Sequence, residues 1–193
     1  MIHENRGLNA HIKDVTRRLA VDGYVALGLD YLGPLGGTPA DPDAATALFK
    51  KLTPEMVTAS GEAALAYLRA RADATGKVGA VGFCWGGGAV NMLAVTDPDL
   101  SGVAYYGRQP AAELVPQIRA PLLLHYAGLD TTIGAGAPAY EAALSANGKI
   151  FEAFVYDGAN HGFNNDTNAA RYDKAAADLS WARTLAFFKR YLA

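Results

Sequence analysis

The chain contains a single cysteine, and the residues around it are typical of a nucleophile. Cys84 stands at the centre of Gly82–Gly86 (GFCWG), directly after the apolar run 78–83. In a turn of the form G-x-nucleophile-x-G, side chains at the two glycine positions would collide with the adjoining strand and helix. A helix that begins here also favours the thiolate, because its free N–H groups and dipole stabilise negative charge. A cysteine that is only a small buried hydrophobe needs none of this, so we predict that Cys84 is a catalytic nucleophile.

Two further residues complete a candidate triad in the chain order nucleophile, acid, base. Asp130 follows the apolar run 121–126 after a glycine turn, and His161 lies in a glycine-rich loop after the run 150–156. Both runs read as strands, so the acid and the base are expected at the carboxyl edge of a sheet, beside the nucleophile. Asp157 also follows a strand and stays as an alternative acid, although Asp157-Gly158 is typical of a turn.

The composition and net charge limit the kinds of molecule that the chain is expected to bind. The 193 residues carry a net charge of −2 with scattered Lys and Arg, which gives no footprint for nucleic acid or an anionic membrane. No apolar run approaches the roughly 18 residues that span a bilayer, and no signal-peptide pattern opens the chain. Four histidines without ligand spacing give no zinc signature. We therefore expect one soluble, cytoplasmic domain, residues 1–193, that binds a small molecule and holds no metal or cofactor.

Strand-like and helix-like segments alternate along the chain. Each strand candidate is short and almost continuously apolar, which is typical of a parallel sheet covered on both faces. The pattern predicts a doubly wound α/β fold. The expected strands are 24–29, 78–83, 102–106, 121–126 and 150–156; the expected helices are 10–22, 53–74, 87–95, 111–118, 137–147 and 169–192; and residues 31–43 are expected to form a loop.

The motifs together resemble the dienelactone hydrolase family, also called carboxymethylenebutenolidases. The resemblance covers nearly the whole chain and is carried by His3–Gly7 (HENRG), Gly82–Gly87 (GFCWGG), Leu129-Asp130 and Asn160–Phe163 (NHGF). It implies a three-layer α/β-hydrolase fold with a mostly parallel sheet. It also implies an enzyme that hydrolyses esters or lactones with a Cys-His-Asp triad and no cofactor.

The resemblance assigns three further roles. A glutamate at the position of Glu4 holds the resting thiol until substrate arrives. The main-chain N–H groups of Asn5 and Trp85 donate to the oxyanion that forms when the nucleophile attacks a carbonyl.

The pocket residues depart from the family pattern. Family members that act on dienelactone bind its carboxylate with arginines, and one of the positions that can carry an arginine is Asn165 in this chain. Arg6 and Arg108 are candidates to supply this charge instead, because a guanidinium pairs bidentately with a carboxylate. Tyr106, beside the second of them, is a third candidate for substrate binding.

The amino-terminal part also departs from the pattern. The fold normally places the glutamate motif at the end of a complete central strand that two more strands precede, whereas here Met1-Ile2 leads directly into it. We therefore expect the N-terminal strands to be missing. Either the sequence is a fragment of a longer chain, or a second copy covers the exposed sheet and forms a homodimer.

Two other functions fit the same residues. A general carboxylesterase or thioesterase would use the same triad on a different acyl group. A catalytically inactive binding or sensing module would instead use the lone thiol for oxidation.

Overall fold

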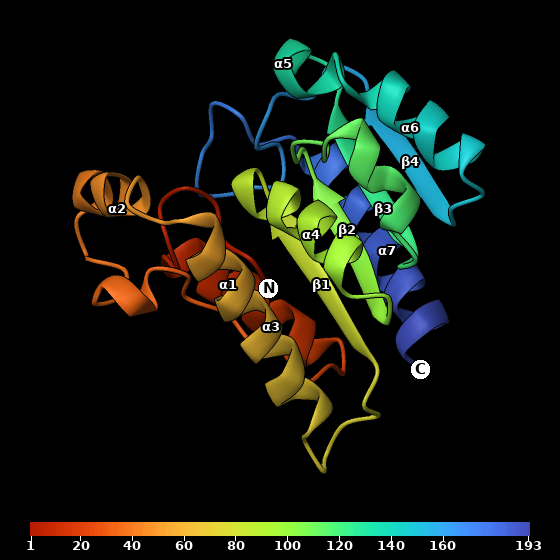
Figure 1. Ribbon diagram of the computed structural model, residues 1–193. Helices are drawn as coiled ribbons and strands as arrows, with labels where there is room; N and C mark the ends of the chain where they lie inside the picture. The colour runs from red at the N-terminus through yellow and green to blue at the C-terminus, as the bar shows by residue number, and fades with distance from the viewer.

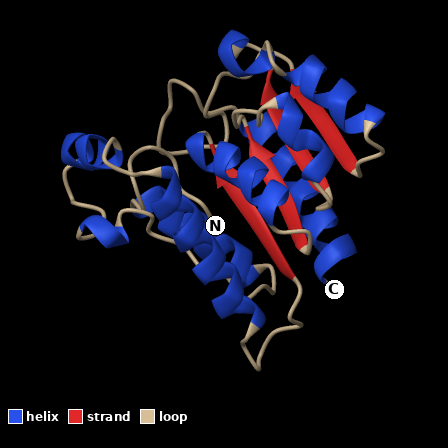
Figure 2. Ribbon diagram, viewed as in Figure 1, coloured by secondary structure: helices blue, strands red, loops and turns tan.

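The computed structural model describes residues 1–193 and is built around a four-stranded sheet (Figures 1 and 2). All neighbouring strands are parallel, and they lie side by side in chain order. The strands are β1 (Val78–Phe83), β2 (Leu100–Tyr105), β3 (Leu122–Ala127) and β4 (Phe151–Tyr156). Each crossover leads to the next strand on the same side, and crossovers between parallel strands are right-handed. The elements that connect the strands therefore lie on one face of the sheet.

Two helical layers cover this sheet, so the fold is the predicted three-layer α/β architecture. Figure 1 shows α4 and α6 in front of the sheet and α7 behind it. The front layer holds α3 (Pro54–Arg69), α4 (Trp85–Thr96), the 3-10 helix η2 (Ala112–Gln117) and α6 (Ala137–Ala146), and the rear layer holds α1 (Ala10–Val21) and α7 (Lys174–Leu192). The remaining helices are η1 (Gly33–Leu35), α2 (Pro42–Phe49) and α5 (Thr131–Gly134).

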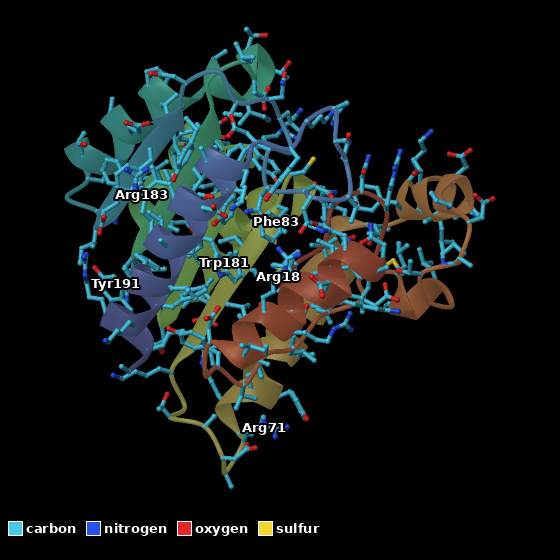
Figure 3. All side chains as sticks on the ribbon, turned by 180° about the vertical axis from the view of Figure 1, so that it is seen from behind. Arg18, Arg71, Phe83, Trp181, Arg183 and Tyr191 are labelled. Carbon is cyan, nitrogen blue, oxygen red and sulfur yellow. The ribbon has the colours of Figure 1, made fainter.

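Alternation along each strand divides the core into two clusters, one on each face. In β1, Val78 and Ala80 pack with the front helices, whereas Val81 and Phe83 pack with α1 and α7. Figure 3 shows this rear face, with Phe83 beside the helix that carries Trp181 and Arg183. Both faces are apolar because both are covered, which is why the strand sequences lack the polar alternation of a half-exposed sheet.

Local capping chemistry sets several helix boundaries. Asn9 Oδ1 accepts from the Ile12 N–H at 3.0 Å and opens α1, and Asp173 Oδ1 accepts from the Ala176 N–H at 3.0 Å and opens α7. Thr53 caps α3, with Pro54 at its first position. These side chains satisfy N–H groups that lack a partner in the first turn. None of the helices combines the length and the apolar character needed to cross a membrane.

Two predicted segments differ in the structure. Residues 24–28 are not a strand, because they pair with no neighbouring strand; only Leu29 forms a bridge. The predicted loop 31–43 contains η1, and the start of α2 overlaps its end. Asp41 caps α2 by accepting from the Asp43 N–H, and Pro42 occupies its first turn, so the signal for this helix was present among the prolines.

The last helix is also shorter than predicted, and its inner face is different. Helix α7 begins at Lys174 rather than near residue 169, and Leu179, expected on its inner side, is 48% exposed. The buried stripe instead includes Ser180 and Thr184, which are polar. A hydrophobicity pattern could not select these residues, because their burial depends on hydrogen-bond partners in the sheet.

A buried polar network joins β3, β4 and α7 through those residues. His125 Nδ1 lies 2.9 Å from the Tyr156 hydroxyl, and His125 Nε2 lies 3.2 Å from Thr184 Oγ1. Arg183 donates to the Tyr156 hydroxyl at 3.1 Å and stacks 3.7 Å from the ring centre of Phe154. Burial lowers the pKa of His125 to about 3, and the nearby Arg183 charge acts in the same direction. His125 is therefore neutral in the folded protein at pH 7.

This histidine makes the fold sensitive to acid. Its folded pKa is depressed, so below an unfolded pKa of roughly 6.5 the unfolded chain binds a proton that the folded chain does not. Stability is thus lost as the pH falls from about 6.5 toward 3, and by pH 4 the free energy of unfolding should drop by on the order of 3 kcal/mol from this site. Urea titrations from pH 7 to pH 4 measure the slope. His125→Gln, which cannot titrate, should flatten it, and equal slopes in both proteins would contradict the prediction.

Candidate active site

Four chemically important residues follow the four strands in turn. Cys84 directly follows β1, Tyr106 directly follows β2, Asp130 follows β3 after a short turn, and His161 follows β4 in the next loop. Because all four strands are parallel, their carboxyl ends lie at one edge of the sheet. This is the edge where open α/β sheets bind ligands.

The turn at Cys84 has the strained geometry that its sequence predicts. Cys84 has φ 56° and ψ −115°, and its N–H donates to the Tyr105 carbonyl at 3.0 Å. A Cβ atom on Gly82 would lie 2.1 Å from the Gly86 carbonyl oxygen, and one on Gly86 would lie 2.6 Å from the carbonyl oxygen of Ile2. The predicted need for glycine at both positions is therefore confirmed. A non-glycine residue with positive φ is a costly conformation that is concentrated at functional sites.

Asp130 and His161 form a close pair beside this turn. His161 Nδ1 lies 2.5 Å from Asp130 Oδ2. The other carboxylate oxygen of Asp130 accepts from the Ile133 N–H at 3.1 Å and caps α5, which fixes the orientation of the carboxylate. The Asp130 side chain is 7% exposed and that of His161 is 28% exposed, so the acid is sheltered and the imidazole is open to a ligand. Asp157, the alternative acid, makes no hydrogen bond or ion pair with His161.

Tyr106 lies beneath the histidine. Its backbone has φ 38°, its ring centre lies 4.9 Å from that of His161, and it is 1% exposed. Burial raises the pKa of its hydroxyl well above the usual value, and the nearby Glu4 and Cys84 act in the same direction. Tyr106 is thus buried against the imidazole of His161, and its predicted contact with substrate stays a prediction.

The thiol of Cys84 is neutral rather than ionised. Burial raises its pKa to about 11, and the carboxylates of Glu4 and Asp130 contribute in the same direction. The Trp85 main-chain N–H and the Arg171 charge lower it, but by less. The expectation that the helix N-terminus would favour a thiolate is corrected here, because desolvation outweighs the helix contribution.

The glutamate motif reaches the same edge. Ile2 forms a parallel bridge with Gly82, so the residues after it lie beside the nucleophile turn. Glu4 Oε2 accepts a hydrogen bond from Asn165 Nδ2 at 3.3 Å, and this contact joins the motif to the loop that carries His161. The Asn5 N–H donates no hydrogen bond within the chain, and the Trp85 N–H is at the first position of α4, where no helical acceptor exists. Neither N–H group donates to a main-chain acceptor, and the Trp85 N–H acts on the Cys84 thiol.

An aromatic cluster surrounds the ring of Trp85, the residue that follows Cys84. The Trp85 ring stacks 5.7 Å from His3 and meets Phe49 of α2 edge-on at 4.9 Å. His3 is buried, and its two ring nitrogens contact the Glu4 carbonyl and the Tyr31 N–H, so Nδ1 carries the proton and Nε2 accepts. Phe49 was not among the predicted residues, because the local sequence pattern predicts no helix at residues 42–49.

Three arginines lie close to the site residues along the chain: Arg6 and Arg108, which were predicted, and Arg171. All three are exposed, and none forms an ion pair. Arg171, which was not among the predicted residues, lies in the same loop as His161, and its Cδ is 3.6 Å from the position that a Cβ on Gly162 would take. Its charge also acts on the Cys84 thiol. The one feature of the sequence that points to Arg171 is its place in the loop that carries His161, the predicted base.

Comparison with known proteins places this site in a family. The sequence pattern of the dienelactone hydrolase family matches residues 1–192, and the chain therefore belongs to this family. It is an enzyme of the hydrolase class.

Individual relatives agree with this assignment. The chain is 30% identical to a candidate carboxymethylenebutenolidase of Saccharolobus solfataricus, over 98% of this chain and 88% of that protein. It is 31% identical to a candidate carboxymethylenebutenolidase of Escherichia coli K12, over 99% of this chain and 76% of that protein. The crystal structure of a candidate dienelactone hydrolase from Klebsiella pneumoniae superposes with a TM-score of 0.84 at 30% identity, over 98% of this chain and 85% of that one.

Proposed function

We propose that this protein hydrolyses carboxylic esters or lactones of small molecules through covalent attack by Cys84. The observation that carries the proposal is the meeting of a strained cysteine turn and a 2.5 Å His161–Asp130 pair at one edge of the sheet. A nucleophile, a base and a residue that orients the base are the elements of covalent acyl transfer.

The proposed reaction has two stages. In the first, His161 takes the thiol proton and the Cys84 sulfur bonds to the carbonyl carbon. The negative oxygen that forms accepts hydrogen bonds from the main-chain N–H groups of Asn5 and Trp85. Collapse breaks the bond to the alkoxide, which leaves with the proton from the imidazolium. In the second stage, water activated by His161 attacks the thioester, and the acid departs as the thiol is restored.

Glu4 is proposed to keep the thiol neutral between turnovers. Its carboxylate raises the pKa of Cys84, and a thiol that is not ionised resists oxidation. The same property argues against an oxidation sensor, because sensor cysteines are exposed and have a low pKa. A general carboxylesterase or thioesterase, which would use the same triad on a different acyl group, stays a second candidate. The aromatic rings of Trp85 and Phe49 suit an apolar acyl or leaving group.

The preference for anionic substrates is proposed to depend on Arg171. Of the cations in the site loops, it is the one whose charge acts on the Cys84 thiol, and it forms no ion pair of its own. An anionic lactone or ester would place its carboxylate against this guanidinium, whereas Arg6 and Arg108 would serve the same purpose only if substrate extended toward them.

A matched panel of lactones and esters, with and without a carboxylate, tests this choice. Arg171→Ala should raise KM for the anionic substrates by roughly 10- to 100-fold, because a charge-assisted hydrogen bond contributes about 1.5–3 kcal/mol. Neutral substrates should be unaffected, and Arg171→Lys should restore part of the binding. Arg6→Ala and Arg108→Ala are the matched controls. If all three alanine variants treat anionic and neutral substrates alike, the carboxylate site is refuted; if the wild-type protein turns over no ester, thioester or lactone, the hydrolase proposal fails as well.

A further inference from the structure

The sheet ends at β4, and one side of this strand has no neighbour. Figure 1 shows β4 beyond β3, with α6 in front of it. The Leu122 N–H donates to the Ile150 carbonyl at 3.0 Å, and the Gly128 N–H donates to the Tyr156 carbonyl at 2.9 Å. Main-chain groups alternate in direction along a strand, so the even-numbered residues of 150–156 pair with β3. We call residues 150–156 the edge segment.

The odd-numbered residues of the edge segment direct their main-chain groups away from the sheet. They are Phe151, Ala153 and Val155. Natural proteins commonly protect such an edge with lysine, proline or a bulge, but the edge segment (IFEAFVY) has neither lysine nor proline, and Glu152 is its one charged residue. Its side chains at Ile150 and Val155 are 60% and 59% exposed. Free main-chain groups beside exposed apolar side chains are the features of a surface that pairs with another strand.

The side chains of the edge segment divide between the two faces of the sheet. Phe151 packs with the front cluster, and Phe154 packs with the rear one. Alternation places Val155 on the front side with Phe151, and Glu152 on the rear side with Phe154. Glu152 pairs there with Arg190 of α7 at 2.6 Å.

An arginine beside the edge segment has no carboxylate partner. The Arg183 guanidinium lies 3.7 Å from the ring centre of Phe154 and donates to the Tyr156 hydroxyl at 3.1 Å, but it forms no ion pair. Figure 3 shows Arg183 on the side of α7 that borders β4. The rear side of this edge therefore presents a positive charge to an incoming strand.

We propose that the edge segment binds the edge segment of a second copy of this chain, as an antiparallel pair with its two-fold axis beside Ala153. In this register Ala153 lies opposite itself, and Phe151 lies opposite Val155 of the second copy. Directly opposite residues of an antiparallel pair can exchange both main-chain hydrogen bonds, so every outward N–H and C=O group of both copies has a partner. A shift by two residues would leave some of these groups unpaired. The inference is independent of the reaction proposed above.

The side chains also match in this register. On the front side, the exposed Val155 is covered by Phe151 of the second copy, and aromatic side chains pair favourably with β-branched ones across strands. On the rear side, Glu152 lies opposite Phe154 of the second copy, over which Arg183 of that copy stacks. The pairing thus gives a carboxylate to a guanidinium that has none, and the two-fold symmetry repeats the contact.

Sedimentation velocity over a concentration series tests the proposal. The wild-type mass should approach twice the 20.3 kDa of one chain as the concentration rises. Ala153→Lys places two ammonium groups opposite each other, so it should raise the dissociation constant by at least about tenfold. Val21→Lys, at a position of α1 that is 88% exposed, is the matched control and should dimerise like the wild type. A wild-type monomer at every concentration, or equal dimerisation of both variants, would overturn the proposal.

A cysteine pair tests the register without adding charge, and it decides the matter if Ala153→Lys does not fold. Ala153→Cys should form a reducible covalent dimer under mild oxidation, because hydrogen-bonded opposite residues have Cα atoms about 5.5 Å apart. Val155→Cys is the control. Its two copies would lie four residues apart along the strands, about 13 Å, which is too far for a disulfide. Equal cross-linking of the two variants, or none in Ala153→Cys, would show association through another surface or none at all, and either result refutes the pairing.

Discussion

Cys84→Ala is expected to lower the turnover of every ester or lactone substrate by at least about 10⁴-fold. In the proposed mechanism the sulfur bonds to the carbonyl carbon, and Cys84 is the one cysteine of the chain. The fold should survive, because alanine is smaller than cysteine and the φ of 56° at this position is equally strained for both residues. Steady-state kinetics and Tm measure the two effects together.

The matched control for this variant is Cys84→Ser, which keeps a side chain that can donate a proton at the same place. Intact mass spectrometry after brief exposure to a slow ester separates covalent catalysis from other mechanisms. The wild-type protein should gain the mass of the acyl group, and Cys84→Ala should gain none. Full turnover by the alanine variant would remove Cys84 from the mechanism.

Asp130→Asn is expected to lower kcat by roughly 10³- to 10⁴-fold with a small change in stability. The carboxylate contacts the imidazole at 2.5 Å through Nδ1, and in the proposed mechanism it stabilises the positive charge that forms when His161 takes the thiol proton. Asparagine keeps the oxygen that accepts from the Ile133 N–H, so it should still cap α5. The loss therefore reports on the lost charge and on imidazole orientation rather than on the helix cap.

Asp157→Asn is the matched control, since Asp157 follows the neighbouring strand and was the alternative acid. Its kcat should stay within about twofold of the wild-type value, because surface substitutions away from such contacts have small effects. A larger loss in Asp157→Asn than in Asp130→Asn would reverse the assignment. His161→Gln should match or exceed the loss in Asp130→Asn, because it removes the base itself.

The sequence alone determined the nucleophile turn and most of the sheet. Residues 82–86 specify their own geometry, because glycines that avoid a collision and a residue that begins a helix are local properties of the chain. The four strands from Val78 to Tyr156 were predicted within about two residues, because buried parallel strands are short, apolar and bounded by turns. Chain order then placed Asp130 and His161 after later strands, and the structure brings these two side chains into contact.

The segment 24–29 shows where local pattern was insufficient. Its apolar residues predict a strand, but a strand is defined by the hydrogen bonds to its neighbour, and no strand pairs with residues 25–28. Helix α2 was missed for a related reason: a short segment rich in proline and glycine reads as a loop unless its cap is weighed.

Only the tertiary structure decided the environment of the candidate triad. The pKa of the Cys84 thiol follows from its burial and from Glu4, which lies far from it in the sequence. Tyr106 is buried against the His161 ring, and Arg171 lies near Gly162 in the loop of His161, which has no periodic pattern. Desolvation, charge and packing act between side chains that are close in space, and a linear pattern records only which residues are close along the chain.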